Sequence, residues 1–410
     1  MVLPTVPPPP PKSLRLKLIA SGYTSANACS LLSALVRPGD SKTVWSGFCF
    51  WRHGGSLDWV DLGAGRGAEG WVDLCGLYLF GLRVPAEAFE GCLSPELLEG
   101  LREAGLLPDA EGGCYEAEFQ IFPHSLHPSK SDPSNFVYFL TDLPRPDADA
   151  VMPIGYDTLE MLSFIASSSP GTAAAAAMSA LDVCCGSGAL GVWYKFLRGS
   201  GDVAVTSVDV NARCLEVTRY NGALNGARTE AVEGSAKDEG IYEGKELVIS
   251  NPPFVALPAS ARSVGYAKAG WEGMDVVDAI VSDAGAADLW MVTELPNPRT
   301  IDLKARAGAL GVGYVVGWVE ADVEGIEDYV EGRRGEYPEV EDEDWEEVKG
   351  GGEREEVVER ALCLVRAGVV LEGKSEGMPG DGESGWTDGD ETDLFLEEAG
   401  EKWIREFFFS

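Results

Sequence analysis

The sequence has few histidines and few basic residues. Its 410 residues include three histidines (His53, His124 and His127), and 32 lysines and arginines stand against 67 acids, which gives a formal charge of −35. His124 and His127 have no cysteine near them, so we expect no zinc site and no other metal centre. An extended nucleic-acid footprint needs clustered basic residues, and the charge therefore disfavours a protein that binds along DNA or RNA.

The sequence also lacks long apolar runs and paired cysteines. No run reaches the roughly 18 residues that a membrane helix requires, so we expect no membrane partner. The nine cysteines form no CxxC pair, and an odd number of scattered thiols favours a reducing compartment. We therefore predict a cytoplasmic protein. Residues 1–11 contain no acid, as in organelle transit peptides, but the helical pattern of Leu14–Leu35 argues against a leader.

Both ends of the chain have biased compositions. Residues 1–12 include five consecutive prolines, which predict a disordered polyproline tail. Residues 320–410 hold 30 acidic and nine basic residues, and thus 21 of the 35 excess negative charges. Within them, residues 335–352 and 373–393 have too little apolar content to pack, so we expect acidic insertions without fixed structure. Between these insertions, Arg354–Ala367 is predicted to be a helix.

One stretch, LDVCCGSGALG at Leu181–Gly191, has the pattern of a nucleotide-binding α/β unit. Its first three residues predict a buried strand. The residues Cys184–Gly188 are small and permit a tight turn with close approach of a ligand, and an amphipathic helix follows. Backbone N–H groups at such a helix start can meet a polar ligand. The next strand ends at Asp209, roughly 20 residues on, where an acid would hold ribose hydroxyls.

A later strand, Glu246–Ile249, leads into Asn251-Pro252-Pro253-Phe254. The Asn251 side-chain oxygen and the Pro252 carbonyl can both accept hydrogen bonds from an NH2 group. The two prolines stiffen the loop, and Phe254 can stack on a planar amide or base. We expect these four residues to be the catalytic group and to select a planar NH2 acceptor. They do not distinguish a glutamine amide from an adenine or guanine amino group.

With LDVCCGSGALG, SVDVN (Ser207–Asn211) and NPPF (Asn251–Phe254) in this order, the segment Val151–Arg299 resembles the class I S-adenosylmethionine-dependent methyltransferases. It is most similar to their small-domain branch, which includes release-factor glutamine methyltransferases and RNA guanine and adenine N-methyltransferases. The resemblance implies S-adenosylmethionine as the cofactor. It also implies an α/β fold: a Rossmann-like methyltransferase domain with a mostly parallel seven-stranded sheet. The pair Cys184-Cys185 departs from the family, which more often has Gly-Thr or a similar small pair there.

The resemblance further implies which residues bind the cofactor. The segment Met152–Thr158 corresponds to the part of the family that covers the methionine end of the cofactor. Ser235 stands where the family often has an acid for the adenine amine, which puts that contact in doubt. The expected cofactor-binding residues are Gly155, Thr158, Asp182, Cys184, Gly186, Gly188, Asp209, Asn211, Ser235 and Asn251.

Ahead of this segment, helical patterns are followed by two short predicted strands, Cys114–Phe122 and Phe136–Leu140. The motif GLREAGLL and a strand ending in TDLP resemble the amino-terminal domain of bacterial proteins in the same branch. Residues 13–145 are therefore expected to be a small N-terminal helical, winged-helix-like domain that recognises substrate. The alternative is that this domain only packs against the methyltransferase domain. A Pro- and Asp-rich linker follows, and residues 150–410 are expected to form the methyltransferase domain.

Three functions stay open at this point. The preferred one is methyl transfer to a glutamine side-chain amide of a protein, with a translation factor as a candidate partner, because the charge disfavours nucleic acid. The second is methylation of adenine N6 or guanine N2 in RNA or DNA, which requires a single-stranded or flipped base. The third is a non-enzymatic adaptor with a methyltransferase fold, against which the intact Asn251–Phe254 motif argues.

Overall fold

The protein is seen in a computed structural model that describes most of the chain up to residue 365. The residues described are 3–28, 31, 70–125, 136–143, 147, 149–167, 177–199, 203–258, 260–261, 275–284, 287–295, 316–317, 323–325, 327, 330–331, 334, 340–348 and 356–365.

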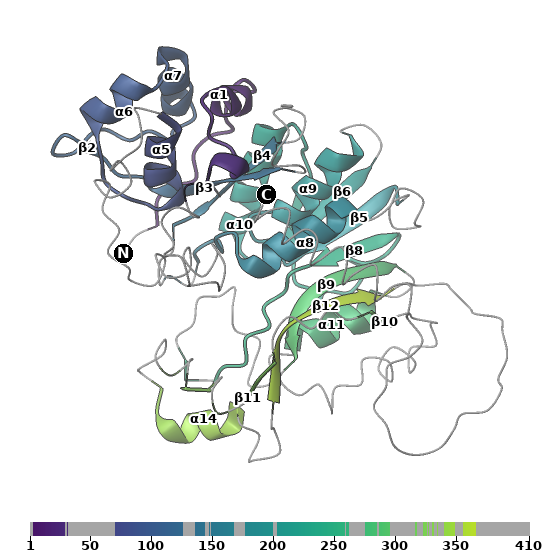
Figure 1. Ribbon diagram of the computed structural model, residues 1–410. Helices are drawn as coiled ribbons and strands as arrows, with labels where there is room; N and C mark the ends of the chain where they lie inside the picture. Colours follow the sequence, from purple (N-terminus) through teal and green to yellow (C-terminus); the bar gives the residue numbers. More distant parts are fainter. Residues whose placement is uncertain are drawn as a thin grey trace, which may run out of the picture.

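Short helices and a hairpin form the N-terminal part of the molecule (Figure 1). In chain order the elements are α1 (Leu14–Ala20), α5 (Gly70–Leu74), the π-helical turn η1 (Cys75–Leu79), β1 (Val84–Pro85), α6 (Ala86–Cys92), α7 (Pro95–Glu103), β2 (Cys114–Tyr115), β3 (Phe119–Ser125) and β4 (Phe136–Asp142). Ser94 caps the start of α7, because its Oγ accepts a hydrogen bond from the Leu97 N–H at 3.2 Å. Helices are thus followed by a strand pair, while a winged-helix-like substrate domain stays a prediction.

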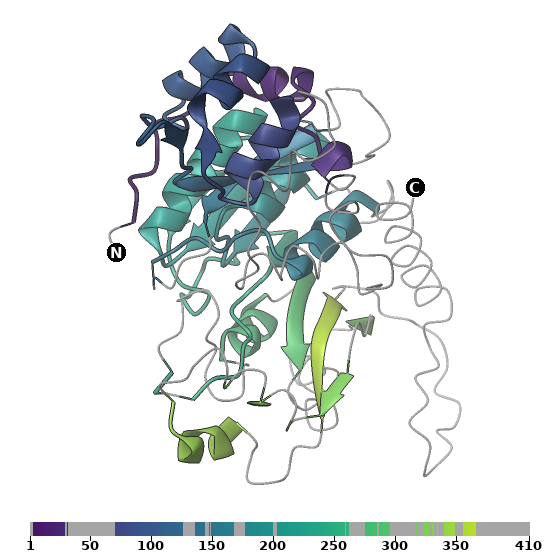
Figure 2. The ribbon, with the colours of Figure 1, turned by 60° about the vertical axis from the view of Figure 1, so that its left-hand side comes forward.

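The rest of the described chain forms a sheet with helices on both faces (Figure 2). Its elements are α8 (Tyr156–Ser167), β5 (Ser179–Val183), α9 (Ala189–Arg198), β6 (Ala204–Asp209), α10 (Ala212–Asn225), β7 (Glu230–Glu233), β8 (Leu247–Ser250), α11 (Asp275–Asp283), β9 (Asp288–Leu295), β10 (Val316–Gly317), β11 (Val323–Gly325), α14 (Asp342–Val348) and β12 (Glu356–Val365). The strands β7, β6, β5, β8 and β9 lie side by side in that order and are all parallel. This is a Rossmann-like arrangement, with the strand order reversing between β5 and β8.

The expected seven-stranded, mostly parallel sheet is met only in part. Beyond β9 lies β12, which is antiparallel to it, and β10 and β11 each pair antiparallel with β12. The described residues therefore give five parallel strands in a sheet of eight. The predicted helix Arg354–Ala367 is wrong, because this stretch contains β12. Its helix-forming residues are outweighed by pairing with β9 on one side and with β10 and β11 on the other.

Alternate side chains of the parallel strands enter two separate cores. Ala180, Leu247 and Ile249 join one cluster with apolar residues of α8, α9 and α10. Leu181 and Val183 join a second cluster with apolar residues of α11. Because successive strand residues point to opposite faces, the near-continuous apolar sequence of β5 and β8 follows from burial on both sides. The strands thereby become a rigid frame for the loops at their ends.

The N-terminal part shares its core with the sheet. One continuous cluster runs from Leu14 and Leu18 through the β3–β4 hairpin to Trp193 of α9. Two asparagines one turn apart on α10 add polar contacts. Asn225 accepts from the Tyr138 N–H (2.9 Å) and donates to its carbonyl (2.8 Å), and Asn221 does the same at Leu140 (2.7 and 2.9 Å). The predicted domain boundary near residues 146–149 therefore marks no break in the core.

The polyproline segment at the N-terminus makes defined contacts. Arg213 donates a hydrogen bond to the Pro4 carbonyl, and Val6 packs against Val151, Cys214 and Val217. An extended polyproline backbone has no internal hydrogen bonds, so its carbonyls can accept from neighbours. The expectation of a disordered tail is wrong for these residues.

One of the two acidic segments also packs. Trp345 and Val348 of α14 are fully buried and pack with Leu257 and Ala261, which follow the Asn251–Phe254 loop. The expectation that residues 335–352 lack structure is therefore wrong for the helix, because apolar side chains three residues apart lie on one face of it. In both views α14 lies at the opposite end of the molecule from the N-terminal helices (Figure 1, Figure 2). Residues 373–393 lie outside the described part of the chain.

Candidate functional site

Three motifs meet at one edge of the sheet. Cys184–Gly188 follows β5, Asp209 ends β6 and Asn251 follows β8, and β5 lies between and parallel to the other two strands. The carboxyl ends of parallel strands share one edge, and a reversal of strand order opens a crevice there. Ser250 Oγ donates to the Val183 carbonyl at 2.8 Å and so joins the ends of β5 and β8. The sequence-predicted motifs are thus brought together.

The turn after β5 is tight and strained. Cys184 has a φ of 58°, which L residues with a side chain rarely adopt. At Gly188 (φ 71°) a Cβ would lie 2.6 Å from Thr218 Cγ2, so no larger residue fits without displacing α10. The Gly188 N–H donates to the Cys185 carbonyl at 2.7 Å, and α9 starts at the next residue. Small residues are therefore required here both by the backbone and by the close approach of α10.

Asp209 fixes this turn from the next strand. One carboxylate oxygen accepts from the Gly186 N–H at 2.8 Å and the other from the Asn211 N–H at 2.9 Å. Burial raises the pKa of Asp209, and these backbone hydrogen bonds oppose that rise. The side chain of the following Val210 is 69% exposed. The carboxylate of Asp209 suits the hydroxyls of a sugar, and the exposed side chain of Val210 suits a planar ring joined to that sugar.

Asp182 does not face this edge. Its side chain is buried, and Oδ2 accepts from the Gly191 N–H at 3.0 Å, which ties β5 to the first turn of α9. Oδ1 has no hydrogen-bond partner within the described residues. Burial raises the pKa of Asp182 to about 8, which the bond from Gly191 partly opposes. Asp182 therefore stabilises the turn by linking the strand before it to the helix after it.

This buried acid predicts a pH dependence of stability. The native state holds the Asp182 proton more tightly than the unfolded chain, whose pKa is about 4. The free energy of unfolding should therefore fall as the pH rises from about 4 to about 8, by at most about 1.4 kcal/mol per pH unit. Asp182→Asn keeps an acceptor for Gly191 and removes the titration, so it should flatten this decline. Melting temperatures of both proteins between pH 5 and pH 9 test it, and parallel curves would contradict it.

The side chain of Asn251 is held in one orientation. Its Nδ2 donates to Asp157 Oδ2 at 2.7 Å and to Thr158 Oγ1 at 3.1 Å. A carboxylate only accepts hydrogen bonds, so the amide nitrogen must face Asp157. Both N–H bonds of Asn251 are thereby used within the protein. Within the described part of the chain no donor contacts Asn251 Oδ1, which is left as an acceptor.

Asp157 is the site residue that the sequence analysis missed. It lies in the first turn of α8, directly before the predicted Thr158, and 94 positions separate it from Asn251. A Cβ at the predicted residue Gly155 would lie 2.3 Å from Asp157 Oδ1, so the glycine leaves room for this carboxylate. An acid in a first helical turn is usually explained by the helix dipole, which is why its sequence position gave no signal of a partner.

Two predicted cofactor residues have local structural roles. Asn211 caps α10 through a bond from the Arg213 N–H to its Oδ1 (3.0 Å) and also donates to the Asp149 carbonyl (2.9 Å). Ser235 lies in the turn after β7, where its hydroxyl accepts from the Lys237 N–H at 3.1 Å. Pro252 is buried, whereas Pro253 and Phe254 are partly exposed beside Asn251. The structure therefore groups Gly155, Thr158 and Asn251 at one point and Gly186 and Asp209 at another.

Among the described residues, no group of three or more His, Cys, Asp or Glu side chains is placed to hold a metal ion. None of the helices in the described part of the chain is long and apolar enough to cross a membrane.

Comparisons with known proteins support the class of the site. Residues 171–267, which contain all three motifs, match the family model described as "Methyltransferase small domain". The resemblance predicted from the sequence is confirmed for this segment. A curated relative, the release factor glutamine methyltransferase of Deinococcus radiodurans, is 30% identical over 172 residues. These cover 38% of this chain and 57% of the relative, so the chain spans less than two thirds of that protein.

Solved structures of methyltransferases are also similar. TrmN from Thermus thermophilus is 15% identical, with 54% of this chain and 52% of that chain covered at a TM-score of 0.30. The ribosomal protein L11 methylase from Lactobacillus delbrueckii subsp. bulgaricus is 11% identical, with 51% and 77% covered at the same TM-score of 0.30.

Proposed function

We propose that this protein transfers a methyl group from S-adenosylmethionine to a planar NH2 group, and that its substrate is a glutamine side chain of a protein. The observation that carries the proposal is the orientation of Asn251. Asp157 and Thr158 take both of its N–H bonds, so the side chain has only its oxygen left, as an acceptor. The Asn251 side chain therefore offers an acceptor alone, which selects a substrate group that donates.

This arrangement meets the chemical demand of amide methylation. The lone pair of an amide nitrogen is delocalised into its carbonyl, so the nitrogen is a weak nucleophile. Two hydrogen bonds from the NH2 group, to Asn251 Oδ1 and to the Pro252 carbonyl, would hold the nitrogen and stabilise the positive charge that develops on it. The fixed Asn251 needs no reorientation when the substrate binds. The acceptor nitrogen gains the methyl group and releases a proton.

The residues at the other strand ends fit the methyl donor. When bound, S-adenosylmethionine supplies a methyl group on a sulfonium, which leaves as the sulfur becomes a thioether. The turn Cys184–Gly188 gives the small residues for close contact, Asp209 gives the acid for ribose hydroxyls, and Val210 gives exposed apolar surface for the adenine. Gly155 and Thr158 lie with Asn251 and would surround the methionine end.

Loss of Asp209 should weaken cofactor binding. Asp209→Ala removes the acceptor for the ribose and also the tie to the Gly186 N–H. We expect S-adenosylhomocysteine to bind about 1.5–3 kcal/mol more weakly, as for hydrogen bonds to a charged group. Titration calorimetry measures this, with Glu216→Ala, an exposed acid on α10, as the matched control. Undiminished affinity would remove Asp209 from the binding site.

The charge and the relative favour a protein substrate. A formal charge of −35 opposes contact with a phosphate backbone. The similarity to a release factor glutamine methyltransferase makes a peptide-chain release factor the first candidate partner. The same acceptor loop would suit adenine N6 or guanine N2, so methylation of RNA or DNA is the alternative chemistry. A non-enzymatic adaptor with this fold would not need the fixed Asn251.

One experiment separates these functions. The protein is incubated with a cell extract and S-adenosylmethionine labelled in the methyl group, and the products are treated with protease or with nuclease. Release of the label by protease alone, followed by detection of N5-methylglutamine, is the expected result. Release by nuclease alone would replace the glutamine substrate by a nucleobase. No transfer to any component, with intact cofactor binding, would favour the adaptor.

A further inference from the structure

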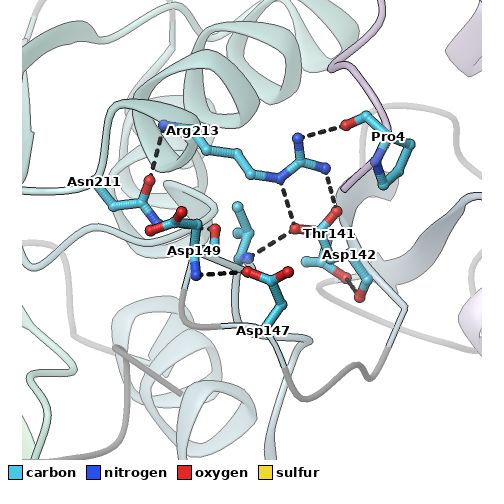
Figure 3. A network of polar contacts seen from close by, with 8 residues as sticks. Pro4, Thr141, Asp142, Asp147, Asp149, Asn211 and Arg213 are labelled. Atoms are coloured by element: carbon cyan, nitrogen blue, oxygen red, sulfur yellow. Dashed lines mark hydrogen bonds and ion pairs between the residues drawn. The ribbon is translucent and has the colours of Figure 1, made fainter. Parts of the chain in front are cut away.

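A buried ion pair connects the N-terminal part to the cofactor side of the sheet. Asp142 ends β4 and Arg213 lies in the first turn of α10, with side chains 0% and 12% exposed. Arg213 Nε donates to Asp142 Oδ2 at 2.8 Å and Nη2 donates to Oδ1 at 2.5 Å, as Figure 3 shows. Two parallel bonds of this kind fix both position and angle.

The pair holds two further segments. Asp142 Oδ2 also accepts from the Val151 N–H at 2.8 Å, and Arg213 Nη1 donates to the Pro4 carbonyl. Val151 begins the short stretch that leads through Gly155 to Asp157 and α8. The network in Figure 3 therefore joins the N-terminal tail, the end of β4, the start of the stretch before α8 and the start of α10.

A chain of hydrogen bonds continues from Arg213 to the proposed ribose acid. The Arg213 N–H donates to Asn211 Oδ1, and the Asn211 N–H donates to Asp209 Oδ1 at 2.9 Å. Asn211 Nδ2 donates to the Asp149 carbonyl, so the stretch before α8 is tied to α10 a second time. Asp209 thus lies at one end of this set of contacts, and Val151, six residues before Asp157 in the chain, lies at the other.

We propose that Asp142 and Arg213 are positioning residues, which set the place of Asp209 and of the Val151–Asp157 stretch for binding of the methyl donor. The inference rests on the proposed function. A buried ion pair contributes little net stability, because desolvation offsets its attraction. Its role where four segments meet is therefore to fix their relative positions. The pair acts through Asn211 and Val151 and does not touch the cofactor.

The test separates position from stability. In the double variant Asp142→Asn/Arg213→Met, asparagine keeps an acceptor for the Val151 N–H and no charge is left buried alone. Its melting temperature should stay within a few degrees of the wild type, because an uncharged replacement of a buried pair is often neutral. Its dissociation constant for S-adenosylhomocysteine, measured by calorimetry well below the melting temperature, should rise about tenfold, the effect of roughly one such hydrogen bond.

A matched control removes an ion pair elsewhere. Arg102→Met breaks the exposed Arg102–Glu90 pair of the N-terminal part and should leave the affinity unchanged. If the double variant does not fold, Arg213→Lys, which keeps the charge and loses the paired geometry, should also weaken binding. Affinity within twofold of the wild type in the folded variant overturns the positioning role alone. Failure of the wild type to bind S-adenosylhomocysteine overturns this inference together with the proposed function.

Discussion

Replacement of Asn251 by alanine is expected to lower turnover by about 10²-fold or more, as for the loss of one preorganised electrostatic partner. In the proposed mechanism the side chain touches the acceptor nitrogen and has at most a marginal contact with the cofactor, so affinity for S-adenosylhomocysteine should stay within a few-fold. Single-turnover methylation of the true substrate measures the first quantity, and calorimetry measures the second. Methylation at the wild-type rate would show that the proposed mechanism is wrong.

The contacts of Asn251 allow a sharper version of this test. Asp157→Ala removes the carboxylate that holds Asn251 Nδ2 at 2.7 Å, so the amide can rotate and present a donor to the substrate. Turnover should fall as in Asn251→Ala, but by less, because Thr158 still accepts a hydrogen bond from the amide.

Phe254→Tyr keeps a stacking ring and should retain much of the activity, whereas Phe254→Ala should mainly weaken substrate binding.

The parts of the site that depend on local sequence could be predicted. The turn Cys184–Gly188 and the Asn251–Phe254 loop each follow an apolar strand, and the acid Asp209 is the last residue of another. Parallel strands bring these ends to one edge. The inward position of Asp182 could not be predicted with them. Strand alternation places neighbouring residues on opposite faces, but only the packing of α9 shows that Asp182 meets Gly191.

The remaining errors have one physical cause, which is contact between residues far apart in the chain. The stretch that forms β12 contains good helix formers, and its state is decided by pairing with β9. Asp157 becomes a site residue only through its hydrogen bond with Asn251. Pro4 is held by a hydrogen bond from Arg213, which lies 209 positions later. Local propensity is a weak guide in such cases because tertiary contacts override it.

The acidic segment around α14 gives the clearest case of such an override and leads to a large expected effect. Trp345 is fully buried and packs with Ala256, Leu257 and Ala261 in a small separate core. Ser260 Oγ also bonds to Asp344 of the same helix. The chain that packs against α14 therefore begins at Val255, directly after Phe254, so this core anchors the far side of the proposed acceptor loop.

Trp345→Ala should accordingly destabilise the protein by about 3–5 kcal/mol, the usual cost of removing a large buried aromatic side chain. The melting temperature should fall by about 2–4 °C for each kcal/mol, and turnover should fall as well because the acceptor loop loses its support. Glu343→Ala, an exposed acid on the same helix, is the matched control and should change neither quantity. Trp345→Phe should recover part of both losses, since a ring again fills the core. An unchanged melting temperature in Trp345→Ala would mean that the segment does not pack, as its composition alone predicts.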